Sequence, residues 1–174
     1  MRSRGGIEAL RVIRPWFAVL LCLSLLAGLA SAGERITRLD AAGFRADLAE
    51  RRGRVVLVNF WATWCRPCRE EIPALMSLQE ELGERGFDLV AVSLDDPADR
   101  ESLLEPFLAK WFPAFTTYLS AERDMDAMVS VVDPYWNEVL PTSYLLSRDG
   151  TMVRRIQGGS TKDGFRAAIE PLLD

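Results

Sequence analysis

The sequence contains no histidine and only three cysteines among its 174 residues. The absence of histidine excludes Ser-His-Asp and Cys-His hydrolytic mechanisms, and it excludes zinc or copper sites built with imidazole. We also expect neither a cofactor nor a metal in this protein. Because two thiols alone can hold a soft ion such as Cu(I), a non-enzymatic copper carrier stays open as an alternative function.

The third cysteine, Cys22, lies in an N-terminal segment with the pattern of a signal peptide. Four arginines precede an apolar stretch from Trp16 to Leu29, and Ala30-Ser31-Ala32 offers a small-x-small cleavage site. We predict that residues 1–32 are a signal peptide and that cleavage leaves residues 33–174 as one domain. The alternative is an uncleaved membrane anchor over residues 15–32, because the apolar stretch is near the lower limit of a bilayer span, ~17 residues.

The charge of the chain is acidic and becomes more so without its N-terminus. The full sequence has a net charge of −4; residues 1–32 hold four arginines and one glutamate, so residues 33–174 carry −7. An acidic domain has no electrostatic reason to bind nucleic acid or an anionic membrane surface. The remaining length is sufficient for a single domain with a hydrophobic core.

The most informative motif is Trp64-Cys65-Arg66-Pro67-Cys68, which directly follows the apolar run Val55–Phe60. At a strand-to-helix junction, two intervening residues allow both sulfurs to meet in the first turn of a helix. There the partial positive charge and free N–H groups stabilise a thiolate. A structural disulfide is the alternative, but closing a loop this short removes little conformational entropy from the unfolded chain. The motif therefore favours a redox-active dithiol.

Hydrophobic periodicity predicts an α/β domain with a central mixed β-sheet and helices on both of its faces. We expect Asp40 to cap the first helix, Pro73 to kink the second, Pro106 to interrupt the third and Ser160, with Asp163, to form a capping box on the last. The expected strands are residues 35–39, 54–60, 87–94, 114–119, 142–146 and 152–157. The expected helices are residues 41–51, 65–84, 99–111, 125–132 and 161–173.

The string from Asn59 to Cys65 (NFWATWC) resembles the TlpA/ResA-like branch of exported thiol-disulfide oxidoreductases, in the thioredoxin-like superfamily. The resemblance covers roughly residues 53–174, and Pro73 and Leu140-Pro141-Thr142 support it. It implies a thioredoxin fold in which Pro141 is cis and faces the dithiol.

The resemblance also raises the question of how protons leave the dithiol. Asn59 stands where thioredoxin has a buried aspartate that exchanges protons with the second cysteine. Glu71, three residues after Cys68, matches an acidic residue of ResA-like proteins. Two interpretations remain open: Glu71 is a solvated helix carboxylate beside Glu70, or it is a partly buried proton acceptor for Cys68.

Each residue near the motif has an expected role. Cys65 is the expected nucleophile, helped by the positive charge of Arg66, and Cys68 is the more buried resolving thiol. Trp61 is expected in the core, whereas Tyr135 and Trp136 either pack an irregular loop or contact a partner. The expected substrate contacts are Trp64, Arg66, Pro67, Leu140 and Thr142, and the expected catalytic set is Cys65, Cys68, Glu71 and Pro141.

The resemblance implies a periplasmic reductant of protein disulfides, with a role in cytochrome c maturation. Its implied partners are a disulfide-bearing protein substrate and a membrane thiol reductant that supplies electrons. A thiol peroxidase of the same fold is a further alternative, but it would need threonine three residues before the reactive cysteine. That position holds Ala62.

Overall fold

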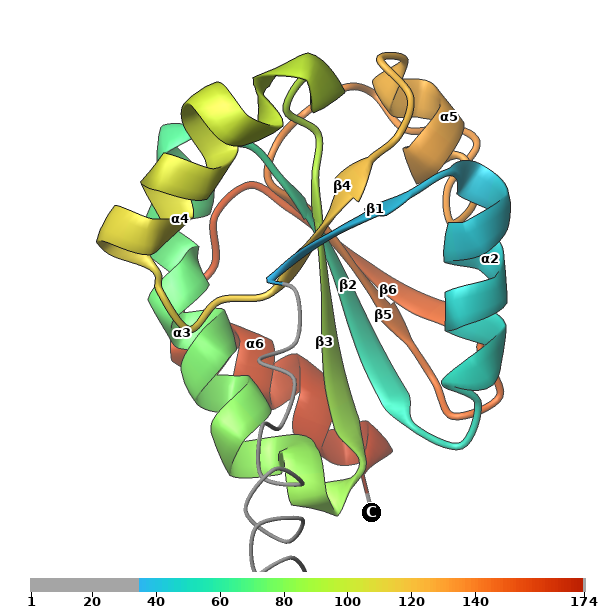
Figure 1. The fold of residues 1–174 in the computed structure, drawn as a ribbon. Helices are drawn as coiled ribbons and strands as arrows, with labels where there is room; N and C mark the ends of the chain where they lie inside the picture. The colour runs from blue at the N-terminus through green and yellow to red at the C-terminus, as the bar shows by residue number, and fades with distance from the viewer. Residues whose placement is uncertain (1–34, 174) are drawn as a thin grey trace, which may run out of the picture. The chain divides into compact units, whose positions relative to one another are not determined.

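The protein is described by a computed structural model over residues 35–173, shown in Figure 1. Six strands form one sheet in the order β1-β4-β3-β2-β5-β6, with parallel pairing from β1 to β2 and antiparallel pairing of β5 with β2 and β6. This confirms the predicted mixed sheet. The strands are β1 Ile36–Leu39, β2 Val55–Trp61, β3 Phe87–Ser93, β4 Thr117–Ser120, β5 Thr142–Leu146 and β6 Met152–Gln157.

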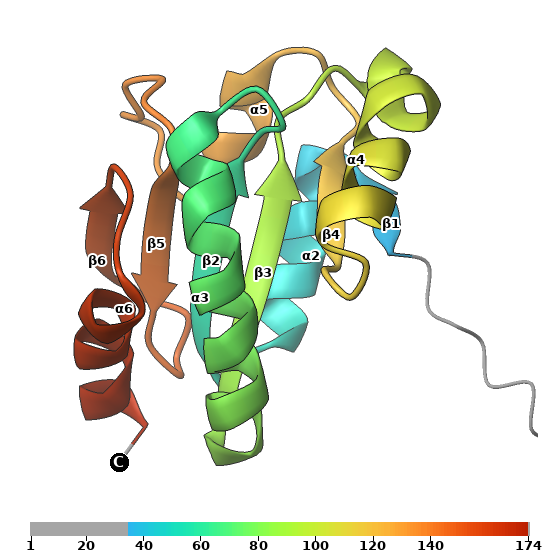
Figure 2. The same cartoon turned by 90° about the vertical axis from the view of Figure 1, so that its left-hand side faces the viewer.

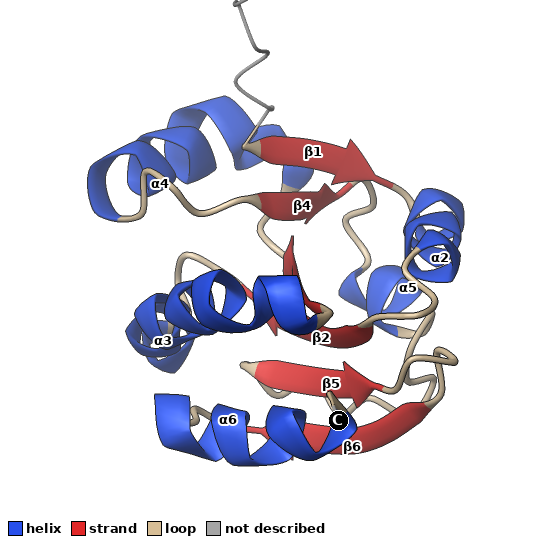
Figure 3. Cartoon of the chain, turned by 90° about the horizontal axis from the view of Figure 1, so that it is seen from below, coloured by secondary structure: helices blue, strands red, loops and turns tan. Residues whose placement is uncertain are grey.

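Helices cover both faces of the sheet, as Figure 3 shows. One face carries α2 (Ala41–Glu50) and α5 (Met125–Val129). The other carries α3 (Arg66–Leu82), α4 (Glu105–Trp111) and α6 (Lys162–Ile169). Figure 2 shows α3 lying along β2 and β3, with its first turn at the edge where these parallel strands end. The start of α3 is therefore placed at the carboxyl ends of the central strands, where α/β sheets commonly hold their functional groups.

Every residue of β2 is buried, because helices cover this central strand on both sides. Alternate residues face opposite layers: Val56, Val58 and Phe60 join the core beneath α2 and α5, while Val55, Leu57 and Trp61 join the core beneath α3. Asn59 belongs by this alternation to the row that faces α3. It is the one polar side chain in an otherwise apolar strand.

Several predicted boundaries differ from the structure. The strand expected over residues 114–119 is β4, which begins only at Thr117, because Phe115 packs in a loop against Trp61. The helix expected over residues 125–132 ends at Val129, where Ser130 is the C-cap. Pro106 does not interrupt a helix; it lies in the first turn of α4, where its missing N–H is not needed, and a π-helical turn precedes it.

The start of the last helix also differs from its prediction. The N-cap is Thr161, whose side chain accepts a hydrogen bond from the Gly164 N–H, and not Ser160. The helix is shorter than predicted, because it ends at Ile169 and a 3-10 turn follows. The prediction for Asp40 is confirmed, since its carboxylate accepts from the Gly43 N–H at 2.7 Å.

The predicted signal segment, residues 1–32, lies outside the described residues. Within residues 35–173, no helix is both long enough and apolar enough to cross a membrane.

Candidate active site

Cys65 and Cys68 form a disulfide at the start of α3, with their Cα atoms 5.3 Å apart. Cys65 is the N-cap of the helix, and its sulfur accepts a hydrogen bond from the Cys68 N–H at 3.3 Å. Pro67 occupies the first turn, where a residue without an N–H favours helix initiation. Both cysteines are buried, but Cys65 is 5% exposed and Cys68 only 1% exposed, so the first cysteine is the more accessible of the two.

The loop that leads from β2 to Cys65 is fixed by a buried carboxylate, Asp95, at the end of β3. Both oxygens of Asp95 accept from the Thr63 N–H at 3.1 Å, and the Thr63 hydroxyl donates to Oδ1 at 2.6 Å. The Ser93 hydroxyl donates to Oδ2 at 2.7 Å. Because Thr63 lies two residues before Cys65, these bonds determine where the first cysteine enters the helix.

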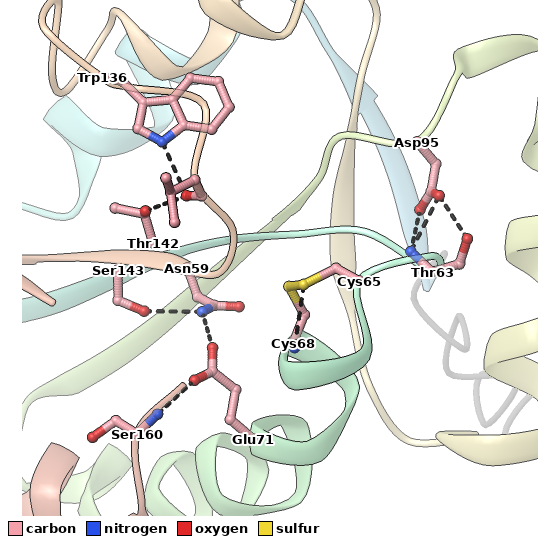
Figure 4. Close-up of a disulfide and its surroundings, with 11 residues drawn as sticks. Asn59, Thr63, Cys65, Cys68, Glu71, Asp95, Trp136, Thr142, Ser143 and Ser160 are labelled. Carbon is pink, nitrogen blue, oxygen red and sulfur yellow. Dashed lines mark hydrogen bonds between the residues drawn. A yellow bond between two sulfur atoms is a disulfide. The ribbon is translucent and has the colours of Figure 1, made fainter. Parts of the chain in front are cut away.

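On the other side of the disulfide, Asn59 and Glu71 form a buried polar network, shown in Figure 4. The amide nitrogen of Asn59 donates to Glu71 Oε1 at 2.8 Å and to Ser143 Oγ at 2.9 Å. The other oxygen of Glu71 accepts from the Ser160 N–H at 3.1 Å. Ser143 lies opposite Asn59 in the β2–β5 register, so the antiparallel pairing creates this contact.

Glu71 is only 3% exposed. Burial disfavours its charged form and raises the pKa of Glu71 to about 7, although the hydrogen bonds from Ser160 and Asn59 act in the opposite direction. A helix residue three positions after Cys68 lies on the same side of α3 as that cysteine. The structure thus places a carboxylate that titrates near neutral pH one turn beyond the inner sulfur.

The Leu140–Pro141 peptide bond is cis, which confirms the prediction from the resemblance. Pro141 directly precedes β5, whose first residue, Thr142, pairs with Phe60 near the end of β2. Leu140 packs against the core cluster that contains both cysteines. The Pro141 carbonyl accepts from the Gly158 N–H at 2.9 Å.

Comparison with known proteins agrees with this geometry. Residues 33–155 match the family described as AhpC/TSA. The chain belongs to this family. It is 31% identical to the thiol-disulfide oxidoreductase ResA of Halalkalibacterium halodurans over 149 residues, which cover 82% of this chain and 80% of that protein. It is 28% identical to ResA of Bacillus cereus over 133 residues, or 76% of this chain and 72% of the relative.

Among solved structures, the fold matches a Chlorobium tepidum protein named as a thiol:disulfide interchange protein, DsbE. The TM-score is 0.61 at 29% identity, with 73% of this chain and 85% of the other covered. These matches confirm the predicted thioredoxin-like fold. Together with the Cys65–Cys68 disulfide, they make this member of the AhpC/TSA family a thiol-disulfide oxidoreductase.

The residues that were expected to contact substrate differ in their exposure. Trp64 is 63% exposed next to Cys65, and Arg66 and Pro67 are also exposed; Leu140 is half-buried. Thr142 is fully buried, and its hydroxyl donates to the Val139 carbonyl, so its side chain is not available to a partner. The Thr142 side chain was expected to contact substrate, but it instead stabilises the turn that precedes β5.

The positive charge of Arg66 is paired with a neighbouring carboxylate, which the prediction for this residue did not include. Its Nε donates to Glu70 Oε1 at 2.9 Å, in an exposed pair one helical turn apart. An exposed ion pair is screened by solvent. The opposite charge of Glu70 offsets part of any effect of Arg66 on Cys65.

Tyr135 and Trp136, which are adjacent in the sequence, differ in their burial. Trp136 packs against the core beneath α2 and α5, and its indole N–H donates to the Val139 carbonyl at 3.3 Å. Tyr135 is 88% exposed. Trp61 is fully buried, as expected, and its indole N–H donates to the Thr117 hydroxyl.

Asp95 and Ser143 were not predicted as part of the site, and Ser160 was predicted only as a helix cap. A usable signal existed only for Asp95, which follows a buried strand parallel to β2, so the ends of both strands meet at one edge of the sheet. Ser143 and Ser160 reach the site through pairing and packing over 84 and 89 residues of chain. In the described part of the chain, no group of three or more Cys, Asp or Glu side chains is arranged to hold a metal ion.

Proposed function

We propose that this protein is an exported reductant of protein disulfides. The Cys65 thiolate attacks one sulfur of a partner's disulfide and forms a mixed disulfide, releasing the other sulfur as a thiolate. Cys68 then attacks Cys65, which releases the reduced partner and leaves the pair oxidised. A membrane thiol protein reduces the pair again, so two electrons pass from that donor to the substrate.

The observation that carries this proposal is the position of the two sulfurs at the start of α3. The Cys65 sulfur caps the helix and accepts a backbone N–H, an arrangement that stabilises a thiolate. Cys68 is the more buried cysteine, as a resolving thiol that attacks only from within should be. Trp64, exposed beside Cys65, supplies surface for a bound peptide, whereas Pro141 itself is buried.

Glu71 is proposed as the group that accepts the proton of Cys68. Oxidation of the dithiol releases two protons, and Asn59 cannot titrate. Glu71 is buried and its pKa is raised to about 7, so it can take up and release a proton at the working pH. The surface interpretation of Glu71 does not agree with its burial.

The proposed reductive direction rests on the dipeptide Arg66-Pro67 between the cysteines and on the resemblance to ResA-like proteins. The proposed role in cytochrome c maturation rests on that resemblance alone. The decisive test is the equilibrium reduction potential of the Cys65–Cys68 pair against glutathione. A value near that of thioredoxin, about −270 mV, would support a reductant; a value near that of DsbA, about −120 mV, would reverse the direction.

The compartment is proposed as the periplasm, with residues 1–32 directing export. Mass spectrometry of the protein from a native membrane and a soluble fraction distinguishes the two forms. A soluble chain that begins at Gly33 supports cleavage, and a full-length chain in the membrane fraction supports the anchor.

A further inference from the structure

Asn59 has one polar atom that the described structure leaves without a partner. Both hydrogens of its amide nitrogen are used, one on Glu71 and one on Ser143. Its carbonyl oxygen, Oδ1, is buried and accepts no hydrogen bond, although the residue is only 1% exposed. A buried acceptor without a donor is costly, so the position of this oxygen calls for a physical reason.

The orientation of the amide is fixed by its neighbours. When Glu71 is ionised its carboxylate only accepts hydrogen bonds, so in that state the nitrogen of Asn59, and not its oxygen, faces Glu71. This leaves Oδ1 on the opposite side, and Figure 4 shows it pointing toward the Cys65–Cys68 disulfide. The sulfurs of a disulfide carry no hydrogen and cannot donate to it, whereas a thiol can.

We propose that Asn59 Oδ1 accepts a hydrogen bond from the Cys68 thiol whenever the pair is reduced. Reduction by a protein dithiol breaks the S–S bond and transfers two electrons and two protons, while the donor becomes a disulfide. One proton goes to Cys68 and the other to Cys65, which can release it to solvent as its thiolate forms. The Cys68 S–H group is the donor that Oδ1 lacks in the oxidised protein. Asn59 thereby stabilises the reduced pair with Cys68 protonated, relative to the disulfide.

Cys68 is the partner rather than Cys65 because of where the two sulfurs lie. Asn59 is on the face of β2 that is turned toward α3, and Cys68 is the inner, 1% exposed cysteine of that helix. The Cys65 sulfur is at the outer end and already accepts the Cys68 N–H. Asn59 thus contacts two titratable groups on α3 through different atoms.

The two contacts of Asn59 have opposite effects. A donor to the carboxylate favours ionised Glu71, and an acceptor for the thiol favours protonated Cys68. The neighbouring groups are the Cys65 sulfur on α3, the Ser143 hydroxyl on β5 and the Ser160 N–H before α6. Loss of Asn59 should therefore lower the pKa of the Cys68 thiol.

The inference rests on the dithiol chemistry of the proposed function, but not on the direction of electron flow or on Glu71 as the proton acceptor. The direct test is the infrared S–H stretching band of Cys68, recorded on the full chain carrying Cys22→Ser and Cys65→Ala. The pH should be about 8, above the pKa of Glu71 and below that of a buried thiol. Exchange to S–D identifies the band.

We expect this band below the frequency of the same thiol group in a hydrocarbon solvent, as for a hydrogen-bonded donor. Adding Asn59→Ala should raise its frequency, whereas Glu71→Gln or Ser143→Ala should leave it low. The inference would be overturned if the chain with Asn59 in place showed the S–H band at the frequency of a thiol without a hydrogen bond. This measurement requires no substitution at residue 59. A low band that persists without Asn59 would also overturn the inference, as would one that is lost with Glu71→Gln, since Glu71 would then be the acceptor.

A second measurement gives the energetic consequence. In chains with Cys65 and Cys68 intact and Glu71→Gln in place, Asn59→Ala should shift the equilibrium with glutathione toward the disulfide by about threefold to tenfold. The Glu71→Gln background removes any indirect effect through that carboxylate. An unchanged equilibrium constant would overturn this inference alone, while a pair that glutathione cannot reduce at all would count against the proposed function.

Discussion

Glu71 and Asp95 are both buried carboxylates near the disulfide, yet their surroundings differ. Asp95 accepts hydrogen bonds from the Thr63 backbone, the Thr63 hydroxyl and the Ser93 hydroxyl, and so it is well solvated by fixed donors. Each oxygen of Glu71 has a single donor, which does not balance its burial, and its pKa rises as a result. Asp95 is therefore suited to holding a loop, and Glu71 to exchanging a proton.

The raised pKa of Glu71 makes stability depend on pH. Because the folded pKa of about 7 is above the ordinary value of 4.5, the native state binds more protons between these values, and the free energy of unfolding falls as pH rises through this window. Glu71→Gln has no charge to bury. The oxidised variant should therefore gain stability relative to the oxidised wild type from pH 4.5 to 8, by up to about 3 kcal/mol.

Urea unfolding of both proteins at several pH values measures this difference. Glu70→Gln is the matched control, because Glu70 lies in the same turn but its side chain is 63% exposed. It should not reproduce the pH-dependent gain. If the unfolding free energies of wild type and Glu71→Gln differed by the same amount at every pH from 4.5 to 8, burial would not raise the pKa of Glu71.

Asp95 should matter both for stability and for the reactivity of Cys65. Asp95→Ala leaves the Thr63 N–H and two buried hydroxyl groups without their acceptor, which should cost about 1–3 kcal/mol of unfolding free energy. The freed loop should also slow the attack of Cys65 on an aromatic disulfide reagent. Glu80→Ala, at an exposed position of α3, should change neither quantity by a comparable amount. Equal losses in the two variants would mean that Asp95 has no special role in positioning Cys65.

At the scale of single elements, local sequence predicted best where one pattern had no competitor. The run Val55–Phe60 could only be a buried strand, and the periodicity from Ile72 to Leu82 could only be a helix face. The start of α6 was different, because Ser160 and Thr161 are both good N-cap residues. The structure uses Thr161, while the Ser160 N–H donates to Glu71 from α3, 89 residues away. Local sequence holds no information about that contact.

The two candidate caps of α6 give a matched pair of substitutions. Thr161→Ala removes the side-chain acceptor for the Gly164 N–H and should lower the free energy of unfolding by about 1 kcal/mol. Ser160→Ala keeps the backbone N–H that donates to Glu71 and should have a much smaller effect. Urea unfolding at fixed pH compares them. A larger loss for Ser160→Ala would restore the capping box predicted from the sequence.

At the scale of the whole domain, the site combines residues that are far apart in the chain. The cysteine motif and the turn at Pro141 were recognisable, because each is a short string with a characteristic composition. The network around Asn59 was not, since it depends on the register that sets Ser143 opposite Asn59 and on the packing of the loop before α6. A single sequence predicted which residues react, but it could not show which groups surround them.

The outer position of Cys65 and the inner position of Cys68 predict which cysteine forms a mixed disulfide with a partner protein. In the full chain with Cys22→Ser, Cys68→Ser leaves Cys65 able to attack but removes the thiol that resolves the mixed disulfide. Partner proteins should then accumulate as covalent adducts. Cys65→Ser, the matched control, keeps only the 1% exposed inner thiol and should trap far fewer. Non-reducing electrophoresis after exposure to a disulfide-bearing protein separates the adducts. If Cys65→Ser trapped as much partner as Cys68→Ser, the inner sulfur would be the one that attacks, and the roles of the two cysteines would have to be exchanged.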